Sequence, residues 1–287
     1  MPDQSIIVGL IGAGIQSSLS PAMHEREGAA QGFRYAYRLI DLDVLGLTAA
    51  ALPELMASAE REGFAGVNIT FPCKQAVIEW LDELSPDARA IGAVNTVLLR
   101  DGRRLGHNTD CSGFAEGFRR AMPDISRDRV VLFGAGGAGA AVAHALLTLE
   151  TRQLVLVDVD AARAGDLAQA LCARFGAGRA LALQDPAAAI AGADGLVNAT
   201  PVGMAKFPGL PLPTELLSPH LWVADIVYFP LQTQLLAEAT ARGCRTMSGA
   251  GMAVFQAAGA FRLFSGVEPD ANRMLAHFAE LTQRSPI

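Results

Sequence analysis

The sequence predicts an α/β protein of two domains, one with a mixed sheet and one with a doubly wound parallel sheet. The chain has 287 residues, which suits two domains of about 100–150 residues each. Hydrophobic residues make up 51% of the chain and aromatic residues 6%, a mixture that favours close helix-on-sheet packing over an aromatic-rich β-sandwich. Short apolar runs alternate with helical patterns from end to end, which is typical of α/β folds.

The first part of the chain combines parallel crossovers with a hairpin. We expect strands at residues 6–12, 33–41 and 65–70, and helices from Pro21, over 48–62 and near Gln75. Asp101-Gly102 is a β-turn signal between strand patterns at 94–100 and 104–108, so these strands should form a hairpin. This region therefore forms a mixed α/β unit.

A second series starts near Ser112 and alternates more regularly. A helix is expected at 112–121, followed by strands at 129–133, 153–158, 180–183, 195–199, 221–227 and 245–247, with helices between several of them. This alternation indicates an open, doubly wound parallel sheet. Two helical patterns, at 251–264 and 269–282, close the chain. The predicted domains are 1–110 with 249–287, and 111–248.

Composition excludes several classes of function. The formal net charge of −6 argues against a nucleic-acid or anionic-membrane surface, which would need a basic stripe. No apolar stretch reaches about 18 residues, and the start lacks the pattern of a secretion signal, so we expect a cytoplasmic protein. We expect it to be a monomer or a homodimer. The four cysteines and five histidines are scattered, and this spacing predicts no metal site and no disulfide framework.

A glycine-rich motif predicts a dinucleotide site. A β-branched strand pattern leads into GAGGAG at residues 134–139, and an Ala-rich helix follows. The first glycine would make the tight turn, the second would let the backbone approach a pyrophosphate, and the third would allow close helix–strand packing. Asp158 ends the next strand, where an acidic residue would bind the ribose hydroxyls; the alternative is that Asp158 only caps the following helix.

The residues after this strand favour NAD over NADP. A carboxylate at Asp158 would repel the 2′-phosphate of NADP, and Val159 offers no cation to bind it. Asp160 adds negative charge, and only Arg163 opposes it. A similar pattern occurs earlier, with Gly12-Ala13-Gly14 after the first strand and Asp41 at the end of the second, but its third glycine position is Ser17. We interpret Gly12–Gly14 as a turn that leads into a substrate loop.

Polar groups gather where strands of the first region end. Ser18 and Ser20 precede a helix, where hydroxyls either cap the helix or bind a carboxylate. The chain has 23 basic residues, and only Lys74 and Lys206 are lysines. A retained lysine is a candidate for proton transfer, which guanidinium cannot perform near neutral pH. Three Asn-Thr or Asn-x-Thr groups within residues 68–109 suggest a surface that recognises several hydroxyls.

Several motifs together resemble the shikimate dehydrogenase family. These motifs are SxSPxxH at residues 18–24, NxTxPxK at 68–74, GAVNT at 92–96, GxNTDxxG at 106–113, GAGGAG at 134–139, NATPxGM at 198–204, DxxYxPxxT at 225–233 and GMxxxQAxxAF at 251–261. The acidic VDVD segment is similar to the NAD-using quinate/shikimate branch. Two positions depart from the pattern: Glu25 stands where many members have Asn, and Ser248 replaces a commoner Asp.

The resemblance implies roles for the matching residues. Lys74 and Asp110 would be the catalytic pair at the reacting carbon. The residues implied to bind the ring carboxylate are Ser18, Ser20 and Tyr228, and those implied to contact ring hydroxyls are Thr70, Asn95 and Gln256. The predicted cofactor-binding residues are Gly134, Gly136, Gly137, Ala138, Gly139, Asp158, Arg163, Thr200, Gly203 and Met204.

The expected activity is NAD-dependent interconversion of shikimate with 3-dehydroshikimate, or of quinate with 3-dehydroquinate. On this view residues 111–248 form a Rossmann domain that binds NAD, and the other domain binds the polyhydroxylated ring carboxylate. Two alternatives stay open: a dehydrogenase for an amino-substituted ring, and a non-catalytic NAD-binding regulator. A regulator would have no need of a proton-transfer pair such as Lys74 and Asp110.

Overall fold

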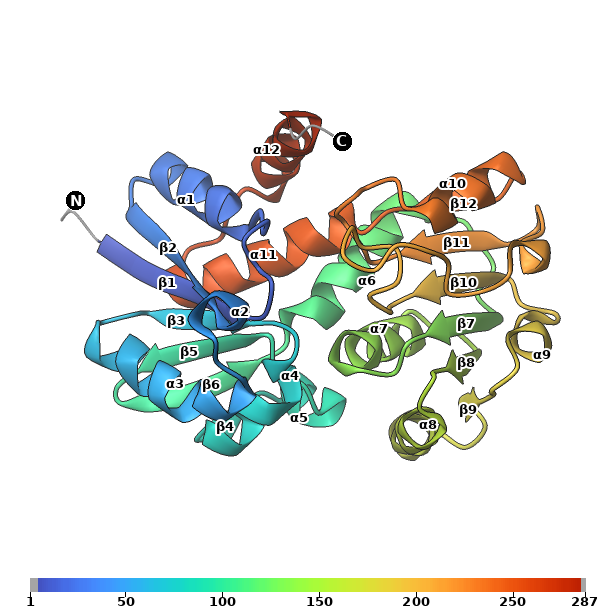
Figure 1. Ribbon diagram of the computed structural model, residues 1–287, viewed down its shortest axis with the longest axis horizontal. Helices are drawn as coiled ribbons and strands as arrows, with labels where there is room; N and C mark the ends of the chain where they lie inside the picture. Colours follow the sequence, from blue (N-terminus) through green and yellow to red (C-terminus); the bar gives the residue numbers. More distant parts are fainter. Residues whose placement is uncertain (1–4, 285–287) are drawn as a thin grey trace. The chain divides into compact units, whose positions relative to one another are not determined.

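The computed structural model describes residues 5–284 (Figure 1), and these form two compact units. Unit 1 contains the described residues up to Gly113 and from Val254 onward, and unit 2 is Phe114–Ala253. The boundaries lie inside the helices α6 (Thr109–Ala121) and α11 (Ala250–Ser265). They differ by a few residues from the predicted domain limits because both helices continue through the change of unit.

Within the described residues, unit 1 has a six-stranded mixed sheet in the order β2-β1-β3-β5-β6-β4. Its strands are β1 (Ser5–Gly12), β2 (Arg34–Asp41), β3 (Gly66–Ile69), β4 (Glu83–Leu84), β5 (Thr96–Arg100) and β6 (Arg103–His107). β1 pairs in parallel with β2 and β3, whereas β5 is antiparallel to β3 and β6. The predicted hairpin is confirmed, since Asp101 and Gly102 join β5 to β6 with φ of 54° and 69°, as a tight hairpin turn requires.

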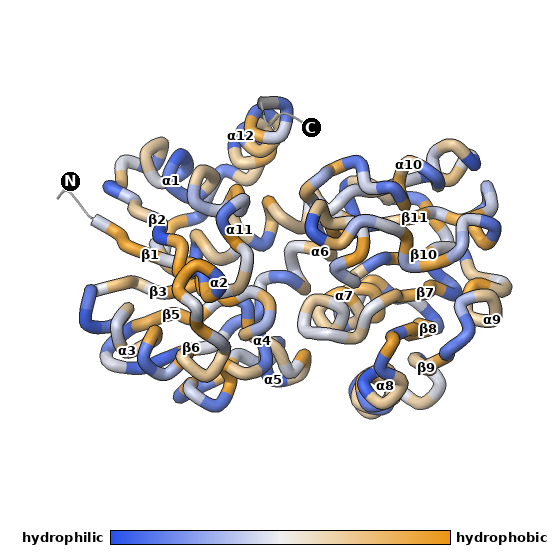
Figure 2. The backbone as a smooth tube through the Cα atoms, in the orientation of Figure 1, coloured by the Kyte–Doolittle hydropathy of each residue, from blue (hydrophilic) through white to orange (hydrophobic). Residues whose placement is uncertain are grey.

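Helices cover both faces of this sheet. They are α1 (Ser20–Ala30), α2 (Leu42–Leu45), α3 (Leu52–Arg61), α4 (Cys73–Ala76), α5 (Pro86–Ile91) and the unit 1 part of α11, with 3₁₀ turns η1 (Ala49–Ala51) and η2 (Val77–Trp80). A further helix, α12 (Ala271–Arg284), packs on α1. On one face Met56 and Ala59 of α3 pack with Val67 of β3. On the other, Phe261 and Phe264 of α11 pack with β1 and β2. Figure 2 shows β1 coloured mainly as hydrophobic, whereas β2 and β6 also have hydrophilic parts.

The helix predicted to start near Gln75 is present and short. The α-helical part, α4, ends at Ala76 and continues as the 3₁₀ turn η2. β4 and α5 were not predicted from the sequence. β4 has only two residues, too few for an alternating pattern to be detected. α5 begins with a recognisable cap, because Ser85 Oγ accepts the backbone N–H of Ala88.

Unit 2 contains the predicted parallel sheet, six-stranded in the part of the chain that the structure describes. The strands are β7 (Arg129–Phe133), β8 (Gln153–Val157), β9 (Ala180–Ala182), β10 (Gly195–Asn198), β11 (Trp222–Asp225) and β12 (Arg245–Met247). Their order, β9-β8-β7-β10-β11-β12, is the Rossmann order, with a switch point between β7 and β10. β7 and β8 read VVLF and LVLV in their buried parts, as expected for strands buried on both faces.

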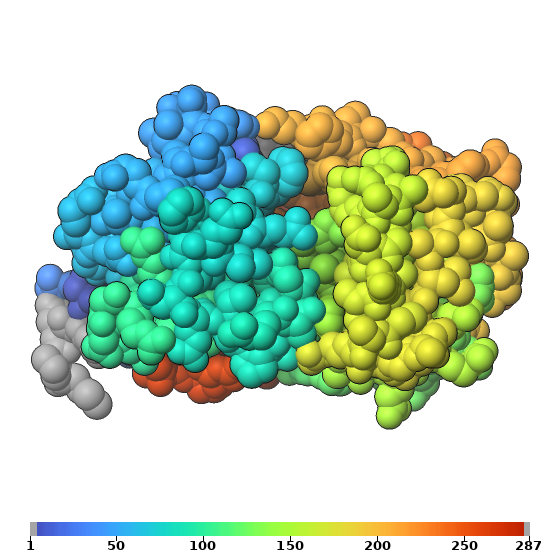
Figure 3. All heavy atoms as spheres, turned by 90° about the horizontal axis from the view of Figure 1, so that it is seen from below, coloured from blue at the N-terminus to red at the C-terminus, as the bar shows by residue number. Residues whose placement is uncertain are grey.

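The helices of unit 2 are α7 (Gly137–Thr148), α8 (Ala161–Phe175), α9 (Pro186–Ile190) and α10 (Gln234–Ala241), with η3 (Thr214–Leu216) and the unit 2 parts of α6 and α11. α9 and α10 pack on the sheet through Ile190 and Leu235. The segment around α8, yellow-green to yellow in Figure 3, covers one face of this unit. Among residues 5–284, no helix is long and apolar enough to span a membrane.

Candidate active site

Lys74 and Asp110 lie together in unit 1. Lys74 is in the single turn of α4, after β3, and Asp110 is in the first turn of α6. Lys74 Nζ donates to Asp110 Oδ2 at 2.5 Å, with 16% and 6% of the two side chains exposed. We expected α6 to begin near Ser112, but it begins at Thr109. Asp110 therefore belongs to a helix start, where the partial positive charge of the helix favours a carboxylate.

Asn95 fixes the orientation of Asp110. Its Nδ2 donates to Asp110 Oδ1 and to Thr109 Oγ1, both at 2.9 Å, and its Oδ1 accepts the Thr109 backbone N–H at 2.7 Å. Both amide hydrogens of Asn95 are thus bonded to the start of α6. In this arrangement Asn95 holds the carboxylate; the contact with a ring hydroxyl that the family resemblance implies for Asn95 stays a prediction.

The network continues through three buried residues, of which Asn68 and Thr96 belong to the predicted hydroxyl-recognising groups without a role of their own, and Tyr37 was not predicted. Thr96 Oγ1 donates to Asn95 Oδ1 at 3.1 Å, and Asn68 Nδ2 donates to Thr96 Oγ1 at 3.0 Å. Tyr37 Oη donates to Asn68 Oδ1 at 2.9 Å. The Asn-Thr pair at 95–96 was the available signal for Thr96. Nothing in the local sequence links Tyr37 to Asn68, 31 residues away.

Ser18 and Ser20 lie at the start of α1. The N-cap residue of this helix is Leu19, which makes no side-chain cap. Ser18 Oγ accepts the backbone N–H of Ser20 at 3.3 Å, so the interaction is local. Both serines are half-buried. Glu25, a departure from the family pattern, accepts the backbone N–H of Tyr37 at 3.0 Å and so joins α1 to β2.

The remaining predicted substrate residues are placed as follows. Thr70 directly follows β3 and is half-buried; a Cβ at Gly12 would lie 2.3 Å from its Cγ2, so the two loops approach closely. Gln256 is half-buried on α11, where its backbone N would lie 2.6 Å from a Cβ at Gly113. Tyr228 follows β11 in unit 2, and its role stays a prediction.

The glycine loop of unit 2 has the conformation that its motif requires. Gly134 has φ of 98°, and a Cβ there would lie 2.8 Å from Ala199 O. A Cβ at Gly139 would lie 2.0 Å from Gly134 O, so only glycine allows this packing. Gly136 is the N-cap of α7 and has φ of −74°, and a Cβ there would meet nothing within 4 Å. Open space at a helix N-terminus fits an incoming pyrophosphate.

Asp158 is bound to this loop. Its Oδ2 accepts the Ala135 N–H at 2.6 Å, and its Oδ1 accepts the Asp160 N–H at 2.9 Å. The cap of α8 is Asp160, whose side chain accepts the Arg163 N–H, so the alternative in which Asp158 only caps the helix is wrong. Arg163 Nη1 lies 3.7 Å from Asp158 Oδ1 and its Nη2 3.1 Å from Asp160 Oδ2. Val159 is fully exposed.

The other predicted cofactor residues follow β10 in a tight turn. Thr200 Oγ1 donates to Asn198 Oδ1 at 2.7 Å. Gly203 has φ of 104°, and Met204 is 40% exposed. Asn198 Nδ2 donates to Asp225 Oδ1 at 3.0 Å. Burial raises the pKa of Asp225 to about 6, against the opposing effect of hydrogen bonds from Thr233, Val227 and Asn198.

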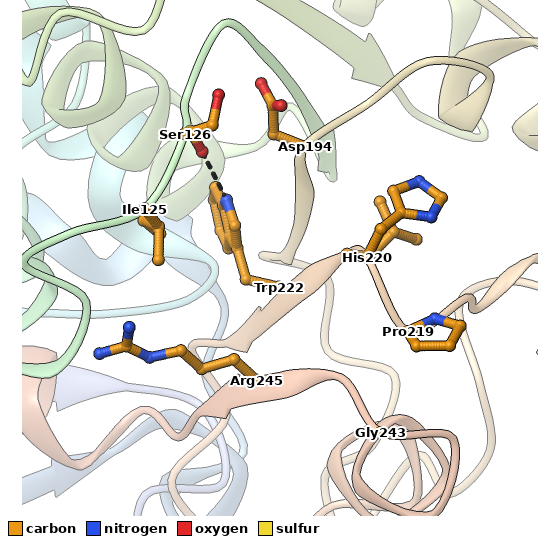
Figure 4. A pocket seen from close by; sticks show the side chains of 9 residues that line it. Ile125, Ser126, Asp194, Pro219, His220, Trp222, Gly243 and Arg245 are labelled. Carbon is orange, nitrogen blue, oxygen red and sulfur yellow. Dashed lines mark hydrogen bonds between the residues drawn. The ribbon is translucent and has the colours of Figure 1, made fainter.

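A hollow of about 250 Å³ lies elsewhere on unit 2, and Figure 4 shows residues that line it, among them Trp222, His220 and Arg245. Trp222 and Arg245 begin β11 and β12, so the hollow lies at the amino ends of these strands. Ligands of open α/β sheets bind outside the carboxyl ends, and we assign this hollow no role. Among residues 5–284, no group of three His, Cys, Asp or Glu side chains could hold a metal ion.

Comparisons with known proteins agree with these features. Residues 10–97 match the family model of the shikimate dehydrogenase substrate binding domain. The chain is 58% identical to a shikimate dehydrogenase (NADP(+)) of Streptomyces avermitilis, over 98% of this chain and 97% of the relative. It is 50% identical to a quinate/shikimate dehydrogenase (NAD(+)) of Corynebacterium efficiens, over 98% and 100%.

A solved structure is similar over nearly the whole chain. Quinate dehydrogenase from Corynebacterium glutamicum in complex with NAD superposes with a TM-score of 0.89 at 46% identity, covering 96% of this chain and 99% of that one. With identities this high over this length, and with a Rossmann strand order in unit 2 and a mixed sheet in unit 1, the chain belongs to the shikimate dehydrogenase family.

Proposed function

We propose that this protein is an NAD-dependent dehydrogenase of shikimate, quinate or both. Unit 1 would bind the ring and unit 2 the dinucleotide. The observation that carries the proposal is the hydrogen-bonded pair of Lys74 and Asp110 at the carboxyl end of the unit 1 sheet. The names of relatives at 58% and 50% identity support the same reaction class.

In the proposed mechanism Lys74 exchanges a proton with the reacting oxygen. Oxidation of the ring alcohol releases a proton from the hydroxyl, which neutral Lys74 Nζ accepts; the ammonium returns it when the ketone is reduced. Asp110, held through Oδ1 by Asn95, keeps Nζ oriented through Oδ2. The bound nicotinamide supplies the hydride acceptor. Gly136 leaves room for the pyrophosphate, and the first N–H groups of α7 would bind it.

We propose NAD over NADP on the charges at the end of β8. Asp158 and Asp160 place two carboxylates there, and Arg163 interacts with both. Arg163 is also the observation that favours the second candidate, an NADP-dependent enzyme, because an arginine released from its acidic partners could bind a 2′-phosphate. Relatives of both names occur, with the 58% identical one named for NADP(+) and the 50% identical one for NAD(+).

Asp158→Ala tests the coenzyme assignment. Removal of this carboxylate should lower the preference for NAD over NADP by about tenfold or more, since one charge repulsion is lost. The ratio of kcat/KM for the two coenzymes is the measurement. Asp128→Ala, which changes an exposed acidic residue of unit 2 beside Arg152, is the matched control. An unmoved coenzyme ratio in Asp158→Ala would show that this carboxylate does not set the selectivity.

The substrate is tested by following NADH absorbance with shikimate, quinate and their amino analogues, each with NAD and with NADP. We expect turnover of shikimate or quinate with NAD. Quinate carries one more hydroxyl, on the carbon that bears the carboxylate, so the choice between them depends on space near Ser18 and Ser20. Faster turnover of an amino analogue would move the assignment to that substrate. Cofactor binding without turnover of any ring would favour the non-catalytic regulator.

A further inference from the structure

The loop between β1 and α1 is held by a carboxylate of the neighbouring strand. Asp41 is the last residue of β2 and is 3% exposed. Its Oδ1 accepts the Gly14 backbone N–H at 2.9 Å, and its Oδ2 accepts that of Ile15 at 3.0 Å. Gln16 Nε2 also donates to Oδ2, at 3.0 Å. Three consecutive loop residues are therefore bound to one buried anion.

The same loop is fastened to the segment that carries Lys74. The Ala13 N–H donates to Phe71 O at 2.9 Å, and the close approach of Gly12 to Thr70 admits no side chain at residue 12. At its far end the Ser18 N–H donates to Ile15 O at 2.9 Å. Asp41 binds the start of this turn, and the turn ends at Ser18.

Unit 2 shows what is particular about this carboxylate. Asp158 directly follows a strand, β8, and accepts an N–H of the glycine loop. Asp158 and Asp41 each also accept the backbone N–H two residues further on. Asp41 differs in accepting four hydrogen bonds, which is about the capacity of a carboxylate. Asp41 thus has no accepting position left for ribose hydroxyls, although its sequence setting is that of a dinucleotide site.

We propose that Asp41 is a positioning residue for the substrate carboxylate, acting through the loop that carries Ser18 and Ser20. The two consecutive N–H groups of Gly14 and Ile15 form an anion-binding concavity, and Asp41 occupies it. The ligand carboxylate is thereby directed to the serine hydroxyls. Burial alone would raise the pKa of Asp41, but hydrogen bonds from Gln16 and from backbone N–H groups lower it, so the anion persists near neutral pH. This inference rests on the proposed function.

Asp41→Asn is the test, because electrostatics and positioning predict opposite results. Loss of a negative charge near the site should favour an anionic substrate. Loss of the loop anchor should disfavour it, because the Asn NH2 group replaces one carboxylate oxygen and cannot accept the hydrogen bonds of the donors that face it. We expect KM for shikimate to rise about tenfold or more, with kcat and KM for NAD little changed. The preference for shikimate over methyl shikimate, which lacks the charge, should fall.

Two further variants make this result specific. Gln16→Ala removes one of the four hydrogen bonds and should raise KM for shikimate about threefold, as expected for a loss near 0.7 kcal/mol. Glu60→Gln is the matched control: it also replaces a carboxylate of unit 1 by an amide, in the ion pair with Arg104 at 2.7 Å, and should leave KM unchanged. If Asp41→Asn does not fold, Gln16→Ala decides, and an unchanged KM in that variant overturns the proposal.

Ser18→Ala separates this inference from the proposed function. If the wild type oxidises shikimate and Ser18→Ala raises its KM, the carboxylate assignment stands. An unchanged or lower KM in Asp41→Asn then overturns only the positioning role. If Asp41 and Ser18 act through one loop, the variant that carries both Asp41→Asn and Ser18→Ala should show a KM rise smaller than the product of the two single effects. Independent, multiplying effects count against the proposal. An inactive wild type instead counts against the proposed function, whereas an unchanged KM in Ser18→Ala counts against the assignment of Ser18 to the substrate carboxylate and with it against the positioning role.

Discussion

Asp110 is held between two donors, and this determines what Lys74 can do. Its Oδ2 accepts from Lys74 and its Oδ1 from Asn95, so the carboxylate cannot rotate without the loss of a charge-assisted hydrogen bond. Asn95 is in turn fixed by Thr96 and by the backbone of α6. The lysine therefore depends for its position on a buried polar network in which each member named here has partners.

Lys74→Met should lower turnover by about 10²–10⁴-fold, since this is the usual contribution of a positioned acid–base group. Methionine keeps much of the chain length and removes the exchangeable proton. NAD affinity, measured by calorimetry, should stay unchanged because the dinucleotide motif lies in unit 2. Lys206→Met, at the other lysine of the chain and on an exposed loop, is the control and should keep full turnover. Wild-type turnover in Lys74→Met would remove this residue from the mechanism.

The chemistry of single residues could be predicted from the sequence where it depended on local motifs. Lys74 and Asp110 stood out through residue type and family motif. The contacts of Asp41 with Gly14 and Ile15 could not be predicted, because they cross 26–27 residues between neighbouring strands. The partners of Asn95 were also missed, because α6 begins three residues earlier than its apolar pattern indicates.

At the scale of helices and strands, hydrophobic periodicity predicted the parallel sheet of unit 2 well. It predicted poorly the short elements of unit 1, β4 at the edge of the sheet and α4. β7 and β8 are apolar runs bounded by turn residues, and β12 was predicted at its observed limits. β4 and α4 have too few residues for any period to be detected. These short elements are held by tertiary contacts, such as the pairing of β4 with β6.

The packing of α12 on α1 depends on a buried carboxylate. Glu27 is 1% exposed and accepts from Arg273 Nη2 at 2.6 Å and Nε at 2.8 Å. Arg273→Ala should lower the free energy of unfolding by about 2 kcal/mol, because Glu27 is left buried without its cation; the usual value for a buried pair is reduced here since Arg273 is 38% exposed. Urea denaturation measures the change. Arg262→Ala, which breaks an exposed pair with Glu268, should change it by about 0.5 kcal/mol or less.

Asp225 at the end of β11 should make stability depend on pH. Its pKa is about 6 in the folded chain against an ordinary value of 3.8. The stability that it contributes is full below pH 3.8 and is lost as the pH rises through 6, on the order of 3 kcal/mol in total. Asp225→Asn should remove this part of the pH dependence. Urea unfolding of both proteins at several pH values between 4 and 7 is the measurement; parallel curves would contradict the assigned pKa.

At the scale of the whole molecule, the proposed activity is divided between two compact units. The Lys74–Asp110 pair and the hydroxyl-rich network lie in unit 1, and the glycine loop with Asp158 lies in unit 2. This division could be predicted from the motifs because each lies at the end of a strand. The limits of the units could not, since α6 and α11 contribute residues to both units as unbroken helices.

Binding of the two ligands should therefore be separable by single substitutions. A ligand at a hundred times its Kd stabilises the folded state by about 2.7 kcal/mol, which a thermal-shift experiment detects. A Cβ at Gly136 meets nothing within 4 Å and φ is −74°, so we expect Gly136→Val to fold; its side chain would fill the space assigned to the pyrophosphate. This variant should lose the shift caused by NAD and keep that caused by shikimate. Ser18→Ala should show the reverse. Loss of both shifts in Gly136→Val, with its unliganded Tm unchanged, would mean that the ring binds only after the dinucleotide and that the two sites are coupled.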